Sequence, residues 1–124
     1  MTKMMIVDNS EESRLLMRDF LLAHNHNVIV EASDGIETIE KYYSEKPELV
    51  LLDLAMPKLD GLSILKKIRF QDPTSKVIMI VDNDNIKIFE ECTRLGVLAF
   101  LTKPFDLNDV LSAISFSNET VIMK

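Results

Sequence analysis

Five short apolar runs, each followed by a stretch with helical spacing, constrain the fold of this 124-residue chain most strongly. Most of the runs do not alternate with polar residues, which is typical of strands buried on both faces of a parallel sheet. The runs are Met4–Val7, Val28–Val30, Leu49–Leu52, Val77–Val81 and Leu98–Leu101. A strand–helix unit repeated five times, with right-handed crossovers, predicts an α/β fold in which helices cover both faces of the sheet.

The segments between the runs carry apolar residues at intervals of three and four, the spacing of helices with one buried face. The expected helices are Ser10–His24, Gly35–Ser44, Asp60–Phe70, Asn85–Leu95 and Asp106–Phe116. Their buried stripes are expected to be, in order, Leu16, Phe20 and Ala23; Ile36, Ile39 and Tyr43; Leu62, Leu65 and Ile68; Ile88, Cys92 and Leu95; and Leu107, Val110, Leu111 and Ile114.

Residues with capping chemistry mark several ends of these helices. Ser10 precedes the first helix and is an N-cap candidate. Asp106 precedes the last helix and is followed three residues later by Asp109, a spacing that suits a reciprocal cap. Gly96 follows the fourth helix, where a left-handed terminator is expected.

Length and composition narrow the class of protein. The length predicts one domain over residues 1–124, with residues 118–124 as a tail or the start of a linker. The net charge of −6 argues against a nucleic-acid binder or docking on anionic membranes. No apolar run approaches the ~20 residues that span a bilayer. The sequence at the N-terminus becomes acidic after only five apolar residues, which does not fit a signal peptide. Cys92 is the single cysteine, so a reducing, cytoplasmic setting is expected.

Polar residues that suit phosphoryl chemistry end four of the five apolar runs. Ligands of open parallel sheets bind beyond the carboxyl ends of the strands. The residues delivered there are Asp8-Asn9, Asp53, Asp82-Asn83 and Thr102-Lys103-Pro104. Three carboxylates this close repel one another unless a cation neutralises them, and hard oxygen ligands favour Mg²⁺. An aspartate beside Mg²⁺ and a lysine can act as a nucleophile towards phosphorus and form an aspartyl-phosphate.

Three segments carry a family resemblance that extends over essentially the whole chain. Ile6–Ser10, Leu49–Gly61 and the pair of Gly96 with Phe100–Phe105 closely resemble the receiver domain of two-component response regulators, of the chemotaxis-receiver type. The resemblance implies a flavodoxin-like, doubly wound, five-stranded parallel sheet in the order 2-1-3-4-5. It also implies a cytoplasmic signalling domain, not an enzyme.

The resemblance assigns a role to each matching position. Asp53 is the expected phosphoacceptor, Lys103 pairs with the phosphoryl group, and Phe100 is the aromatic whose rotamer reports activation. The expected Mg²⁺ ligands are Asp8, Asn9, Asp53 and the backbone carbonyl of Ala55. The expected phosphodonor is a histidine kinase or a histidine phosphotransfer protein. Output then passes to a protein target through the face built by the fourth helix, the fifth strand and the fifth helix; a homodimer is left open.

Two positions depart from the family pattern. Asn9 stands where the family has a second carboxylate that binds the metal, so a reduced Mg²⁺ affinity is expected. Val81 stands where the family has a Ser or Thr hydroxyl at the end of the fourth strand, and valine cannot donate that hydrogen bond. These departures motivate an alternative hypothesis, a receiver-like interaction domain that acts without phosphorylation.

Overall fold

The computed structural model describes residues 3–55, 60–82 and 86–118 and contains the expected alternation of strands and helices. The elements are β1 (Lys3–Val7), α1 (Glu11–Ala23), β2 (Asn27–Ala32), α2 (Gly35–Glu45), β3 (Leu49–Asp53), α3 (Gly61–Gln71), β4 (Val77–Asp82), α4 (Ile86–Arg94), β5 (Ala99–Lys103) and α5 (Leu107–Asn118). The strands form one parallel sheet in the order β2-β1-β3-β4-β5. The predicted fold class and strand order are confirmed.

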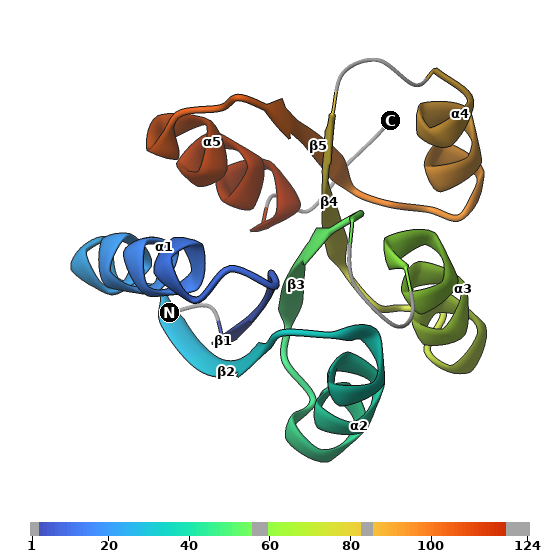
Figure 1. Cartoon of the computed structure of the whole chain (residues 1–124), viewed down its shortest axis with the longest axis horizontal. Coiled ribbons are helices and arrows are strands. Elements are labelled where there is room, and N and C mark those ends of the chain that lie inside the picture. Colours follow the sequence, from blue (N-terminus) through green and yellow to red (C-terminus); the bar gives the residue numbers. More distant parts are fainter. Residues whose placement is uncertain (1–2, 56–59, 83–85, 119–124) are drawn as a thin grey trace.

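The sheet separates two apolar layers, because successive residues of each strand point to opposite faces. Helices α1 and α5 cover one face, and α2, α3 and α4 cover the other (Figure 1). Met4, Ile6 and Leu51 pack with residues of α1 and α5, whereas Met5 and Leu52 belong to the cluster that packs against α2, α3 and α4. All five residues of β3 are buried, which explains why its sequence is a continuous apolar run.

The predicted stripes of α3, α4 and α5 pack against the core, whereas those of α1 and α2 do so only in part, through Phe20 and through Ile39 and Tyr43. In α1 the buried side chains are Met17 and Leu21, while Leu16 is 62% exposed. Helix α1 is apolar around much of its circumference, so spacing alone did not select the side that faces the sheet.

Helix α2 differs from the predicted stripe for a second reason, because polar residues occupy its inner side. Thr38 and Tyr42 are buried there, while Ile36 is 55% exposed. The Thr38 hydroxyl donates to the Asp34 carbonyl at 2.7 Å and the Tyr42 hydroxyl donates to Asp72 at 2.7 Å. These bonds satisfy the buried hydroxyls, so the two residues can replace apolar ones on this face.

The predicted helix ends are confirmed where they fall within the described residues. The Ser10 side chain accepts from the backbone N–H of Ser13 at 3.2 Å. Asp106 and Asp109 cap each other reciprocally, with N–H···O distances of 3.1 and 3.0 Å. Gly96 takes the left-handed conformation at φ +85°, which ends α4. No helix within the described ranges has the length and apolar content needed to cross a bilayer.

Candidate functional site

A buried carboxylate and a lysine form an ion pair at the carboxyl edge of the sheet. Asp53 is the last residue of β3 and is 4% exposed. Lys103 ends β5, two strands away, and its Nζ lies 3.0 Å from Asp53 Oδ2 and 3.3 Å from Oδ1. In the strand register Asp53 pairs with Ile80 of β4, and Ile80 pairs with Leu101 of β5. Lys103 therefore lies two residues beyond the level of Asp53, and its long side chain spans this offset to reach the carboxylate.

Opposing influences act on the pKa of Asp53, and the net effect is an increase. Burial is the largest cause and raises the pKa, because the charged carboxylate loses its hydration. The hydrogen bond from Lys103 and the one from the Ala55 N–H, at 3.1 Å, lower it. The nearby Asp8 carboxylate raises it further. Lys103 thus offsets only part of the cost of burying the Asp53 charge, and a cation bound nearby would stabilise the carboxylate further.

Asp8 and Asn9 lie in the loop that follows β1 and face the same cavity as Asp53. Asp8 Oδ1 accepts from the Ser10 backbone N–H at 2.9 Å, which forms an Asx turn. Asp8, Asn9, Asp53 and Lys103 all line a cavity of about 910 Å³. Carboxylate and amide oxygens are hard donors, and Mg²⁺ takes only one or two carboxylates while it keeps several waters. The side chains at this cavity therefore fit Mg²⁺.

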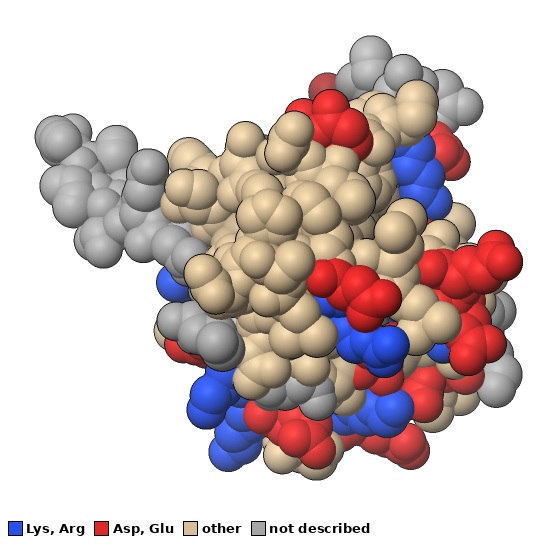
Figure 2. Space-filling model, turned by 90° about the vertical axis from the view of Figure 1, so that its left-hand side faces the viewer, with Lys and Arg blue, Asp and Glu red and all other residues tan. Residues whose placement is uncertain are grey.

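The same cavity continues between α1 and α5 as an apolar groove. Its walls there include Leu16, Met17 and Phe20 from α1, Phe105 from the loop before α5, and Leu107 at the start of α5. Figure 2 looks onto this side of the molecule, where uncharged side chains cover much of the surface and charged ones gather along the lower part. The cavity therefore has a polar end at the ion pair and an apolar end between α1 and α5.

A smaller cavity of about 120 Å³ lies against the Asp53–Lys103 pair and is also lined by Ala55, Val81 and Asp82. Asp82 is exposed, and it does not line the cavity that Asp8 and Asn9 share. Within the described ranges, no three His, Cys, Asp or Glu residues are grouped closely enough to hold a metal. The expectation of three gathered carboxylates is thus corrected: β3 separates β1 from β4, so Asp8 and Asp82 stay apart. Asn83 and residues 56–59 lie outside the described residues.

Val81 and Phe100 belong to one apolar cluster beside the ion pair. Val81 is 2% exposed and stands opposite Thr102 in the strand register. Phe100 is half-buried against the same cluster, and its ring packs on Phe89 of α4 with centroids 4.8 Å apart. A change in the packing of Phe100 would therefore alter its contact with α4 directly.

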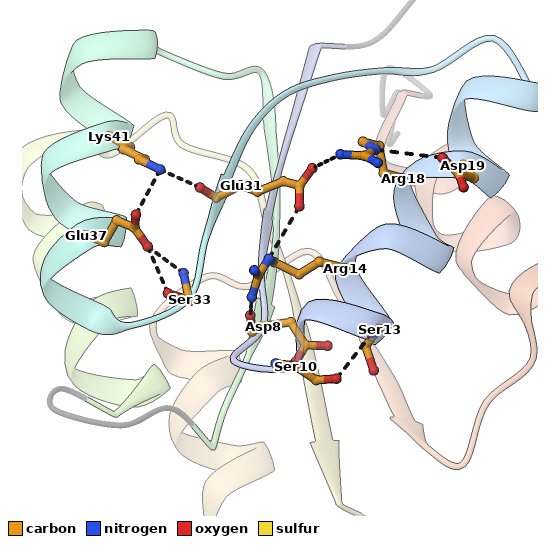
Figure 3. Close-up of polar contacts among 10 residues, drawn as sticks. All are labelled: Asp8, Ser10, Ser13, Arg14, Arg18, Asp19, Glu31, Ser33, Glu37 and Lys41. Atoms are coloured by element: carbon orange, nitrogen blue, oxygen red, sulfur yellow. Dashed lines mark hydrogen bonds and ion pairs between the residues drawn. The ribbon is translucent and has the colours of Figure 1, made fainter.

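Arg14 is a residue of the site that sequence reasoning missed. Its Nη1 donates to the backbone carbonyl of Asp8 at 2.6 Å, and its Nε lies 3.3 Å from Glu31 of β2 (Figure 3). Glu31 also pairs with Arg18 at 3.0 Å, and the Glu31 carbonyl accepts from Lys41 at 2.8 Å. The Asp8 loop is thus tied to α1 and β2. The contact is to a backbone atom, so the residue types alone gave no signal for it.

The fold and this edge define a flavodoxin-like α/β protein whose chemistry centres on a buried aspartate paired with a lysine. The model of the response regulator receiver domain family matches residues 4–115. The chain belongs to this family of two-component signalling domains.

Curated relatives and solved structures agree with this assignment. The chain is 34% identical over 114 residues to the chemotaxis protein CheY of Listeria monocytogenes, covering 92% of this chain and 96% of the relative. It is 30% identical to sporulation initiation phosphotransferase F of Bacillus subtilis, covering 90% of each. The crystal structure of a CheX–CheY–BeF₃–Mg²⁺ complex from Borrelia burgdorferi superposes with a TM-score of 0.91 at 29% identity, covering 96% of this chain and 90% of that one.

Proposed function

We propose that Asp53 is the phosphoacceptor of this receiver domain and that a histidine kinase or a histidine phosphotransfer protein is the donor. One Asp53 carboxylate oxygen attacks the phosphorus of the donor's phosphohistidine. The new O–P bond forms as the P–N bond breaks, and the imidazole leaves with the bonding electron pair. The observation that supports this assignment best is the contact of Lys103 with both oxygens of a carboxylate that is 4% exposed.

The neighbouring side chains would stabilise the charge that this transfer brings in. The Lys103 ammonium, 3.0 Å from Asp53 Oδ2, is placed to pair with an oxygen of the phosphoryl group. Asp8, Asn9, Asp53 and the Ala55 carbonyl would hold Mg²⁺, which supplies positive charge to the phosphoryl oxygens. Asn9 brings an oxygen without a charge, so we infer a lower Mg²⁺ affinity than a carboxylate at this position would give.

The output surface is proposed to be the face of α4, β5 and α5. The packing of Phe100 on Phe89 links β5 to α4 and gives a route for a change at Lys103 to reach this face. A charge added at Asp53 would bias the population of two arrangements of this region, as in other phosphorylation switches. Val81 offers no hydroxyl to the phosphoryl group, so the bias is expected to be partial without a bound target.

Intact-mass measurement tests the proposal. Incubation with acetyl phosphate and Mg²⁺, or with a phosphorylated donor domain, should add one phosphoryl group to the wild type and none to Asp53→Asn. Asp19→Asn is a matched control, because Asp19 is an exposed carboxylate on α1 that does not line the cavity. If the wild type stays unmodified with both donors, the alternative of an interaction domain that acts without phosphorylation replaces the proposal.

A further inference from the structure

A recess at the opposite edge of the sheet has a charge unlike the rest of the molecule. It lies where α3 and α4 end, has a volume of about 610 Å³ and is lined by four cations, Lys66, Lys67, Arg69 and Arg94, together with Phe70 and Leu95. Among the residues that the structure describes, no Asp or Glu lines it, although the chain carries 20 acidic and 14 basic residues. An acidic protein thus presents a basic recess, far from the edge where Asp53 lies.

Arg69 lines the recess and is fixed in place by hydrogen bonds to backbone carbonyls. Its Nε donates to the Leu95 carbonyl and its Nη1 donates to the Ser75 carbonyl, each at 2.8 Å. A Cβ added at Gly96 would come within 2.8 Å of Arg69 Nη2, so the guanidinium lies directly against this glycine. One positive charge is therefore already ordered before any ligand binds, which lowers the entropic cost of recognition.

The other cations surround Arg69 and are open to solvent. Lys66 forms a long ion pair with Glu91 at 3.6 Å and remains 53% exposed. Lys67 and Arg94 are exposed, and neither forms an ion pair within the residues that the structure describes. An anionic group could approach these cations with little rearrangement.

Phe70 supplies an apolar contact beside these charges. Its side chain is 87% exposed, the highest value among the large apolar residues that are exposed in the described ranges. An aromatic side chain next to an arginine, both at the surface, is the composition enriched at the centre of protein interfaces. The recess thus offers positive charge and an aromatic surface side by side.

We propose that this recess, together with Phe70, docks an acidic segment of a partner protein that carries an apolar side chain among its carboxylates. Charge complementarity argues for this occupant, and the net charge of −6 disfavours a polynucleotide. The recess lies at the amino ends of the strands, because Arg69 binds Ser75 just before β4 begins. A partner here and a phosphodonor at Asp53 could therefore bind at the same time.

Amide chemical shifts of the full chain during a peptide titration test this docking surface. The probe is a short peptide of Asp and Glu around one Leu, and the matched probe replaces every Asp with Asn and every Glu with Gln. We expect the acidic probe alone to shift the amides of residues 66–71 and 94–96. Its affinity should fall about tenfold with Lys67→Glu/Arg94→Glu, and several-fold with Phe70→Ala or when ionic strength rises from about 0.05 to 0.3 M.

Controls separate this surface from general electrostatics and from the proposed phosphorylation site. Lys87→Glu makes the same kind of charge change elsewhere on α4 and should leave the affinity unchanged. Equal binding of both probes, shifts that Lys67→Glu/Arg94→Glu does not reduce, or tighter binding of inorganic phosphate or a DNA oligonucleotide would each overturn the proposal. Asp53→Asn should bind the peptide as the wild type does, so failure here is distinct from failure at Asp53.

Discussion

Asp53 has a carboxylate that burial disfavours and a lysine stabilises. Burial is the dominant cause, so the pKa of Asp53 is raised in the folded protein. The folded state therefore binds the Asp53 proton more tightly than the unfolded chain does. Asp53 contributes its full stability below the unfolded pKa, and this contribution is lost as the pH rises through the raised pKa.

Asp53→Asn is accordingly expected to stabilise the fold at pH 7, by roughly 1 kcal/mol, because it removes a buried charge. Lys103 loses its partner, but its side chain is 39% exposed and water can solvate it. The difference from wild type should shrink as the pH falls through the pKa of Asp53. Urea unfolding of both proteins across this pH range measures it. A loss of stability at pH 7 would mean that the ion pair with Lys103 outweighs the cost of burial.

Asn9 contributes no charge to the proposed metal site, so Asn9→Asp should tighten Mg²⁺ binding. The variant adds one carboxylate to the cavity that holds Asp8 and Asp53, and we expect a gain in affinity of about tenfold. Calorimetric titration measures it, and Asp8→Asn, which removes a charge from the same cavity, should weaken binding. No gain in Asn9→Asp would show that position 9 does not contact the metal.

Sequence reasoning identified the site residues whose side-chain chemistry is distinctive and missed Arg14 and Glu31, which hold the Asp8 loop through a backbone contact. Asp53 and Lys103 end strands of a parallel sheet and Asp8 directly follows a third strand, at the edge where topology predicts ligand binding. Arg14 contacts the carbonyl of Asp8, and Glu31 holds Arg14, and neither residue type marks such a role. The separation of Asp82 from Asp8 also required the strand order, which places β3 between them.

At the scale of elements, the apolar pattern predicted every strand but stopped short of most strand ends. Asp53, Asp82 and Lys103 are the last residues of β3, β4 and β5, because the backbone pairing continues past the last apolar side chain of each strand. Helix spacing gave the buried side correctly only where one side is clearly more apolar. In α1, which is apolar on several sides, packing against the sheet decided the orientation.

Arg14 of α1 holds the loop that carries Asp8, whereas Arg18, one turn further along the same helix, pairs with Glu31. Substitutions of the two arginines should therefore have different effects on the Asp8 loop. Arg14→Ala removes the 2.6 Å bond to the Asp8 carbonyl and should weaken Mg²⁺ binding several-fold, with a stability loss of about 1 kcal/mol. Arg18→Ala is the matched control, because Arg18 pairs with the same Glu31 without touching Asp8 in the contacts seen here (Figure 3). Equal effects of the two substitutions on Mg²⁺ affinity would exclude a positioning role for Arg14.

Val81, near the end of β4, should limit how strongly phosphorylation changes the conformational population of α4. A hydroxyl there could donate to a phosphoryl oxygen, a bond worth ~1 kcal/mol or more to a charged acceptor, and Val81 lacks it. Val81→Thr should therefore enlarge the response of the α4 amides and of Phe100 to beryllofluoride. Amide chemical shifts record this response. A complete shift in the wild type, equal to that of Val81→Thr, would show that coupling does not run through this position.

Across the whole molecule, the doubly wound sheet places the Asp53–Lys103 pair at the carboxyl edge and the basic recess at the opposite edge. Strand order and layer composition could be predicted from five apolar runs and the family resemblance, because both depend on patterns repeated along the chain. The basic recess could not, since its cations come from two helices and gather only when α3 and α4 end side by side. The proposed chemistry itself is local, because the phosphoryl group is carried on Asp53.

Borohydride reduction followed by tandem mass spectrometry tests that claim most directly. Reduction cleaves an aspartyl-phosphate to homoserine and leaves an unmodified aspartate intact, so the product marks the acceptor position. After incubation with phosphorylated donor and Mg²⁺, we expect homoserine at position 53, and at no other position, in both the wild type and the Asp19→Asn control. Homoserine at another aspartate, or its absence throughout a chain that has bound the donor, would contradict the account.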